Sequence, residues 1–184
     1  MRGTGDLVGW SARYAQSLLA SMPDRWQHTA GVARLAQQVA ADVGIEAPEL
    51  VAAAYLHDIG YSPAAHDTGF HPLDGARHLQ ALCLPEMVVR LVAHHTTAAA
   101  EADERGLGHE LARFPRAPDD VADVLLYCDL HTGVTGEEVT LAERISDVRT
   151  RYDQATPVRN ALERSMGHLL SADKRVELLR SRPH

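Results

Sequence analysis

The stretch 51-VAAAYLHDIGYSP-63 carries a histidine and an aspartate, His57 and Asp58, directly after an apolar run. Pro48 suits the first turn of a helix, and the run predicts a helix that ends before Gly60. Because this helix is apolar on all sides, it should be central and buried, with the two polar residues held inside the protein. A buried carboxylate is costly without a counter-ion or a metal, so the pair requires a partner.

The helical period recurs along the rest of the chain, without strand alternation, internal repeats or low-complexity tracts. We therefore expect an all-α fold, a single domain over residues 1–184 built as a bundle of about seven to nine helices. Glycines and prolines in 96–119 predict short helical pieces and a mobile surface excursion, the best candidate for a lid. Helices are expected over 6–21, 25–43 with Asp24 as its cap, 48–59, 72–82, 85–95, 119–131 and 140–152, then from 156 onward, with a short basic helix closing the chain.

Composition and charge narrow the class of protein. Hydrophobic residues make up 45% and charged residues 23%, as in a soluble globular domain. The formal net charge of -7 repels a phosphate backbone, so no nucleic acid polymer is expected as a partner. No segment approaches the roughly 20 apolar residues of a membrane span, which predicts a cytoplasmic protein without a membrane partner. Cys83 and Cys128 lack the spacing of a thiolate zinc site or a disulfide framework.

Further inward-facing histidines and aspartates accompany the pair at 57 and 58. His28 opens the buried stripe of its predicted helix, and Asp129 closes the buried stripe of another. His95 lies on the apolar side of the 85–95 helix, and His94 is the less buried of these two neighbours. Three inward histidines and two inward carboxylates from four helices favour a divalent metal over an arginine counter-ion.

The order of these residues resembles the HD superfamily of metal-dependent phosphohydrolases, whose signature is a distant histidine, an adjacent His-Asp pair and a distant aspartate. The resemblance lies in RWQHTAGVA, AAYLHDIGYSP and LLYCDLHTG, and it covers about residues 25–132. It implies an HD-domain helical bundle. Tyr61 stands where many relatives carry a lysine, so no lysine is available there to contact a substrate phosphate. The resemblance implies that a divalent ion binds to His28, His57, Asp58 and Asp129.

Dinuclear members of the superfamily use two additional histidines between the pair and the final aspartate. GFHPLDGARHL offers His71, and LVAHHTT offers His95 or His94, so we expect one or two divalent ions. Imidazole and carboxylate ligands without thiolate suit Fe, Mn, Co, Ni, Zn or Mg, and the sequence does not choose among them. The alternative interpretation of all these residues is a network of helix caps and ion pairs.

The resemblance implies a metal-dependent phosphohydrolase that acts on a small phosphorylated substrate, such as a nucleotide. A divalent ion can lower the pKa of bound water and polarise a phosphoryl oxygen, and Asp58 would bind the ion and orient this water. Arg25 and Arg77 lie near the predicted ligands in sequence and are candidates to bind the substrate phosphate, with structural ion pairs as the alternative.

Two other functions fit the same residues. The ligand order also resembles the mixed-valent diiron oxygenases that share this fold, and a metal-bound HD domain could serve as a non-catalytic nucleotide-sensing module. The oligomeric state does not follow from these patterns.

Overall fold

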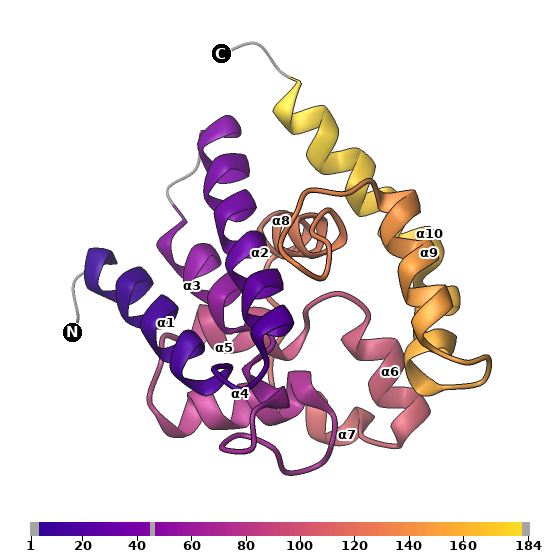
Figure 1. Ribbon diagram of the computed structural model, residues 1–184, viewed down its shortest axis with the longest axis horizontal. Coiled ribbons are helices and arrows are strands. Elements are labelled where there is room, and N and C mark those ends of the chain that lie inside the picture. Colours follow the sequence, from indigo (N-terminus) through magenta and orange to yellow (C-terminus); the bar gives the residue numbers. More distant parts are fainter. Residues whose placement is uncertain (1–3, 45–46, 182–184) are drawn as a thin grey trace.

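The computed structural model describes residues 4–44 and 47–181, and the described chain is all-α, as predicted (Figure 1). It contains ten α-helices, a short 3-10 helix and one isolated β-bridge between Thr132 and Glu138 within those ranges. The described helices include none that is long and apolar enough to cross a membrane. In chain order the helices are α1 (Thr4–Leu18), α2 (Pro23–Asp42), α3 (Pro48–Leu56), the 3-10 helix (Ile59–Tyr61), α4 (His71–Ala81), α5 (Glu86–Ala93), α6 (Ala98–Arg105), α7 (Gly108–Leu111), α8 (Asp119–Leu130), α9 (Leu141–Arg151) and α10 (Pro157–Arg180).

Helix α3 lies at the centre of the bundle, as its apolar sequence predicts. It contacts α1, α2, α5 and α8 (Figure 1). Leu50, Ala53 and Leu56 are fully buried, and each large apolar side chain contributes about 1.5–3 kcal/mol on burial. The chain leaves α3 at Leu56, three residues earlier than predicted, and the 3-10 helix follows. His57 and Asp58 therefore lie in the short connection between these two elements.

Two glycines let the turn after α8 approach α2. A Cβ atom on Gly31 would lie 2.7 Å from the Cα and carbonyl oxygen of Gly136. Gly136 has a φ of 82°, and a Cβ on it would lie 2.4 Å from the carbonyl oxygen of Gln27. This close backbone contact holds the turn beside the part of α2 that carries His28.

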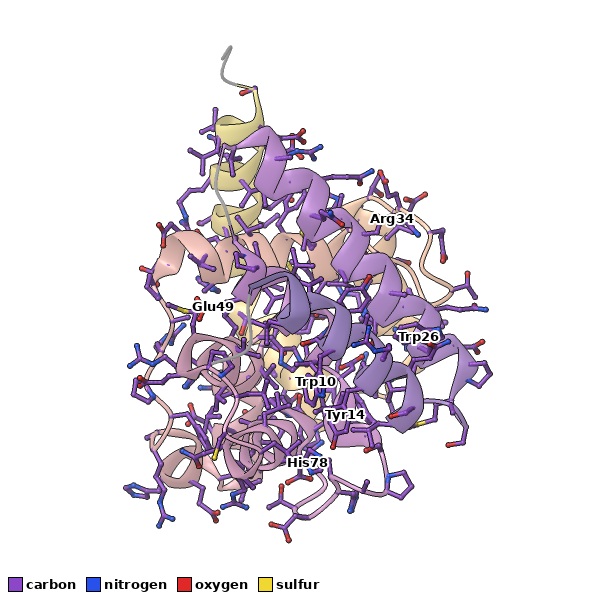
Figure 2. The ribbon with its side chains drawn as sticks, turned by 90° about the vertical axis from the view of Figure 1, so that its left-hand side faces the viewer. Trp10, Tyr14, Trp26, Arg34, Glu49 and His78 are labelled. Atoms are coloured by element: carbon purple, nitrogen blue, oxygen red, sulfur yellow. The ribbon has the colours of Figure 1, made fainter. Side chains whose placement is uncertain are left out.

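Aromatic side chains attach α1 to α4 on the face shown in Figure 2. Trp10 and Tyr14 stack with ring centroids 4.6 Å apart. The Tyr14 hydroxyl lies 2.6 Å from Nε2 of His78, and Figure 2 shows the three labelled side chains in succession. His78 is therefore engaged with α1 and is absent from the cluster of histidines described below.

Some of the predicted helix caps and boundaries are confirmed and others are wrong. Gly44 has the predicted left-handed φ of 71° after α2, and Thr140 forms the predicted capping box with Glu143. The prediction of Asp24 as a cap is wrong, because Pro23 is already helical and Met22 precedes it. The separate closing helix is also wrong, because no proline interrupts the single long helix α10.

The segment 96–119 contains the short helical pieces predicted for it, but part of it packs against the bundle where a surface excursion was expected. Helix α6 packs against α10 and buries Ala98, Glu101 and Ala102. Gly106 ends the helix in a left-handed conformation, and α7 follows at once. These two helices bring the total above the expected seven to nine.

Gly60 allows the 3-10 helix to contact the start of α4. A Cβ atom there would lie 2.0 Å from the carbonyl oxygen of His71, so alanine must displace α4. We expect Gly60→Ala to lower the free energy of unfolding by about 1–3 kcal/mol, measured by chemical denaturation. Gly167→Ala in α10 is the control, because its Cβ would meet nothing within 4 Å and it should be neutral or stabilise by up to about 1 kcal/mol. Unchanged stability in Gly60→Ala would contradict this account.

Candidate metal centre

His28 and Asp129 meet where α2 and α8 lie side by side. Nε2 of His28 lies 3.1 Å from Oδ1 of Asp129, and both residues are buried. The other ring nitrogen, Nδ1, lies 3.0 Å from the carbonyl oxygen of Gly133 in the turn that contacts α2. The close approach of Gly31 and Gly136 thus fixes the ring that faces the carboxylate.

Three histidines of this region share one orientation. In each, Nδ1 faces a backbone carbonyl oxygen, which can only accept a hydrogen bond, so Nδ1 carries the hydrogen. In the neutral ring Nε2 then carries the lone pair, and metal-binding histidines are commonly oriented in this way. The distances are 3.0 Å from His28 to Gly133, 2.8 Å from His57 to Ala54 and 2.7 Å from His95 to Val92.

The lone pairs converge on Asp58. Ligand atoms of His28, His57 and Asp58 lie within 4.8 Å of one another, as do those of Asp58, His71 and His95. Nε2 of His57 is buried without a hydrogen-bond partner and lies 3.5 Å from Asp58 Oδ2. Nε2 of His71 lies 3.1 Å from Nε2 of His95 and 3.4 Å from Asp58 Oδ1. This arrangement fits two divalent cations that share Asp58.

Arginines compensate the charges of the two buried carboxylates. Arg25 donates to Oδ2 of Asp58 at 2.7 Å, and Arg144 donates to Oδ1 of Asp129 at 3.2 Å. Burial alone would raise the pKa of Asp58, but the charge of Arg25 holds it well below its usual value. For Asp129, burial again opposes ionisation, while the contact with His28 and the charge of Arg144 keep the pKa well below its usual value. Both groups are therefore carboxylates.

Burial also favours the neutral form of two histidines of the site, His57 and His71. It lowers the pKa of His57 and holds that of His71 well below its usual value, despite the opposing charge of Asp58. A neutral imidazole and an ionised carboxylate are the forms that bind a metal ion.

Tyr61 of the 3-10 helix lies between His71 and Arg25. Its ring stacks on His71 with centroids 4.1 Å apart, and the guanidinium carbon of Arg25 lies 4.1 Å from the ring centroid. Burial raises the pKa of Tyr61, so it is a neutral wall that fixes the orientation of both neighbours.

Thr96 adds a contact to Asp129. Its φ of 50° is left-handed, which is costly for a β-branched residue, and its hydroxyl donates to Oδ2 of Asp129. The strained residue directly follows His95, so the same turn holds a candidate ligand and a group that orients another.

Two predicted residues lie away from the centre. Nε2 of His94 lies 2.6 Å from the carbonyl oxygen of Phe114, so His95 is the neighbour that joins the centre. Arg77 pairs with Asp67 at 3.0 Å and with Glu110, and it does not line the central cavity. Its place in the helix explains this position, because six residues after His71 the direction of α4 side chains has turned by about 240°.

The candidate ligands other than His57 line a cavity of about 100 Å³. Arg25 and Arg144 line it, together with Arg151 from the end of α9. Another part of the lining is apolar and consists of Leu130, Val148, Tyr152, Val158 and Leu162. The cavity thus combines candidate metal ligands, guanidinium groups and an apolar wall.

The chain belongs to the HD domain family, whose family model matches residues 25–148. Members of this family bind divalent metals, and the described His and Asp clusters could hold them. The match extends past the predicted limit of 132 and includes Arg144. The predicted family resemblance is confirmed.

Two curated relatives carry the name nucleotide-binding protein. One, from Pseudomonas paraeruginosa, is 32% identical over 101 residues, covering 53% of this chain and 34% of the relative. Another, from Pseudomonas aeruginosa, is 31% identical over 101 residues with the same coverage. The chain therefore spans about a third of the length of these relatives. No solved structure matches the chain.

Metal content tests the composition of the two clusters. We expect protein purified without chelators to bind two divalent ions per chain, and His71→Ala or His95→Ala to remove one of them, because each loses a ligand of the second cluster. His94→Ala is the matched control and should retain both ions. Elemental analysis measures the ratio, and equal loss in all three variants would refute the assignment.

The arginine partners predict how the protein behaves without metal. In excess chelator the wild-type protein should stay folded, because Arg25 and Arg144 already compensate Asp58 and Asp129. Arg144→Met should lower the stability of the chelated protein on the order of 3 kcal/mol, because it leaves the buried charge of Asp129 without its arginine partner. Added metal should restore most of the loss. Thermal denaturation with and without metal measures both effects, with Arg149→Met as control. A loss that metal does not reduce would show that Arg144 acts by packing alone.

Proposed function

We propose that this protein is a metal-dependent phosphohydrolase that cleaves a phosphoester of a small molecule, with nucleotides as the first class to test. The observation that carries the proposal is the pair of ligand clusters sharing Asp58, each with Nε2 lone pairs directed inward. When bound at these residues, a divalent metal would supply a Lewis acid and a water of lowered pKa.

The residues around the centre support each requirement of this reaction. Asp58 lies between both clusters and can accept a hydrogen bond from the attacking water while it holds a metal. Arg25, next to Asp58, can donate to a phosphoryl oxygen and stabilise charge that develops there. The apolar wall with Tyr152 suits the organic part of a nucleotide, and the name of the Pseudomonas relatives agrees with that class.

A second candidate is the diiron oxygenase reaction, which the shared carboxylate also favours because it allows two irons to lie close together. It requires iron and consumes dioxygen with an organic substrate. A nucleotide-sensing module is the third, and it would bind nucleotide without turnover.

Turnover by metal-loaded protein separates these functions. We expect hydrolysis of at least one nucleotide or other phosphoester with Mn²⁺, Fe²⁺, Co²⁺, Ni²⁺, Zn²⁺ or Mg²⁺, and a decrease of about 10²-fold or more in Asp58→Asn, which keeps the side-chain shape but removes its charge. Asp120→Asn, exposed in the first turn of α8, is the matched control. Released phosphate is measured, and circular dichroism checks the fold.

The other outcomes identify the alternatives. Oxygen consumption by the iron form without phosphate release would favour the oxygenase. A nucleotide-dependent rise in melting temperature without any turnover would favour the sensing module. Either result would overturn the hydrolase.

A further inference from the structure

Three guanidinium groups gather beside the candidate metal centre. Arg25 comes from α2, and Arg144 and Arg151 come from α9. Arg144 and Arg151 are seven residues apart, about two helical turns, so they lie on the same face of α9. All three line the central cavity.

The same three arginines also line a second hollow. It shares His28 and the three arginines with the central cavity, and Met22, Pro23 and Asp24 at the start of α2 line it together with Val134 of the turn after α8. A ligand bound at the metal centre therefore lies beside guanidinium groups that also face the second hollow. We name the two hollows together the arginine groove, because Arg25, Arg144 and Arg151 line both.

The positive and negative charges in the ion pairs of the groove are equal in number only while no metal is bound. Arg25 pairs with Asp58, Arg144 with Asp129 and Asp147, and Arg151 with Asp147 at 2.5 Å. Three positive charges thus face three negative charges. Two of these aspartates, Asp58 and Asp129, are candidate metal ligands. Because arginines already offset their charges, each bound divalent ion would add two positive charges to the groove.

Other acidic residues of the lining do not remove this excess. Glu101 is paired with Arg105 at 2.7 Å, and Asp24 supplies a single charge at the exposed entrance. A phosphate monoester carries at most two negative charges. With two ions bound, the groove has the charge for a second phosphate group, and a planar guanidinium can donate two parallel hydrogen bonds to phosphate oxygens.

We propose that the substrate carries two adjoining phosphate groups, one at the metal centre and the second bound by Arg25, Arg144 and Arg151. This inference rests on the proposed function and names its substrate class, a diphosphate or polyphosphate ester such as a nucleoside diphosphate or triphosphate. Arg151 is the specificity-determining residue, because its aspartate partner is no candidate metal ligand and its side chain is 36% exposed.

Binding of a non-hydrolysable probe tests the second phosphate site without relying on turnover. Calorimetry would compare methylenediphosphonate with orthophosphate on metal-loaded protein freed of excess metal. We expect Arg151→Gln to weaken methylenediphosphonate binding by about tenfold and to change orthophosphate binding by less than about twofold, because only the longer probe reaches this residue. Arg151→Lys should recover part of the affinity, since it restores the charge.

Arg149→Gln is the matched control. It lies two residues away on α9 and bonds to Glu163 of α10, outside the groove. This variant should bind both probes as the wild type does. An equal effect of Arg151→Gln on the two probes, or no effect on either, would overturn the proposal.

Turnover separates failure of this inference from failure of the proposed function. If the protein hydrolyses monoesters but Arg151→Gln does not change the binding of methylenediphosphonate, the second phosphate site is rejected and the proposed hydrolase function stands. Absence of all phosphoester turnover together with Arg151-dependent binding of methylenediphosphonate would reject the hydrolase and keep the site.

Discussion

The structure depends on the burial of two carboxylates, Asp58 and Asp129, within an apolar helical bundle. Neither could remain ionised there alone, because an uncompensated buried charge costs several kcal/mol. Each carboxylate therefore contacts an arginine, Arg25 or Arg144, and an imidazole from another helix. The arginines compensate charge in the protein as folded, so the candidate ligands are assembled by the fold itself. This differs from a small structural zinc domain, whose folding requires the metal.

Close backbone contacts fix the positions of two histidines in this arrangement. Gly31 lets the turn after α8 approach α2, and that turn supplies the carbonyl oxygen that orients His28. Gly60 lets the 3-10 helix approach α4, and the atom that it approaches belongs to His71 itself. In both places the absence of a side chain sets the position of a histidine. The packing that stabilises the bundle and the positions of the candidate ligands therefore depend on the same contacts.

The sequence predicted those features that depend on a single helix or its end. The stripe below His28, the apolar surroundings of His57 and the capping box at Thr140 follow from local spacing, and the structure places each accordingly. The roles of Arg144 and Arg151 did not follow, because charged residues on a helix face usually meet solvent, and only the path of α9 beside α8 turns them toward the cavity. The packing of α6 on α10 was missed for a similar reason: its alanines gain a buried face only from a helix about 60 residues later in the chain.

The pairing of each arginine with a carboxylate also connects metal binding to anion binding. In the structure the guanidinium groups of Arg25 and Arg144 donate hydrogen bonds to Asp58 and Asp129. A metal ion bound to these aspartates would withdraw their negative charge from the arginines, which would strengthen the attraction of both guanidinium groups for a phosphate. Linkage requires the reverse as well, since an anion that binds to the arginines more strongly in the metal-bound protein must tighten metal binding by the same factor. Under the proposed function, ion pairs that look structural in the folded chain would thereby be the means by which metal and substrate favour each other.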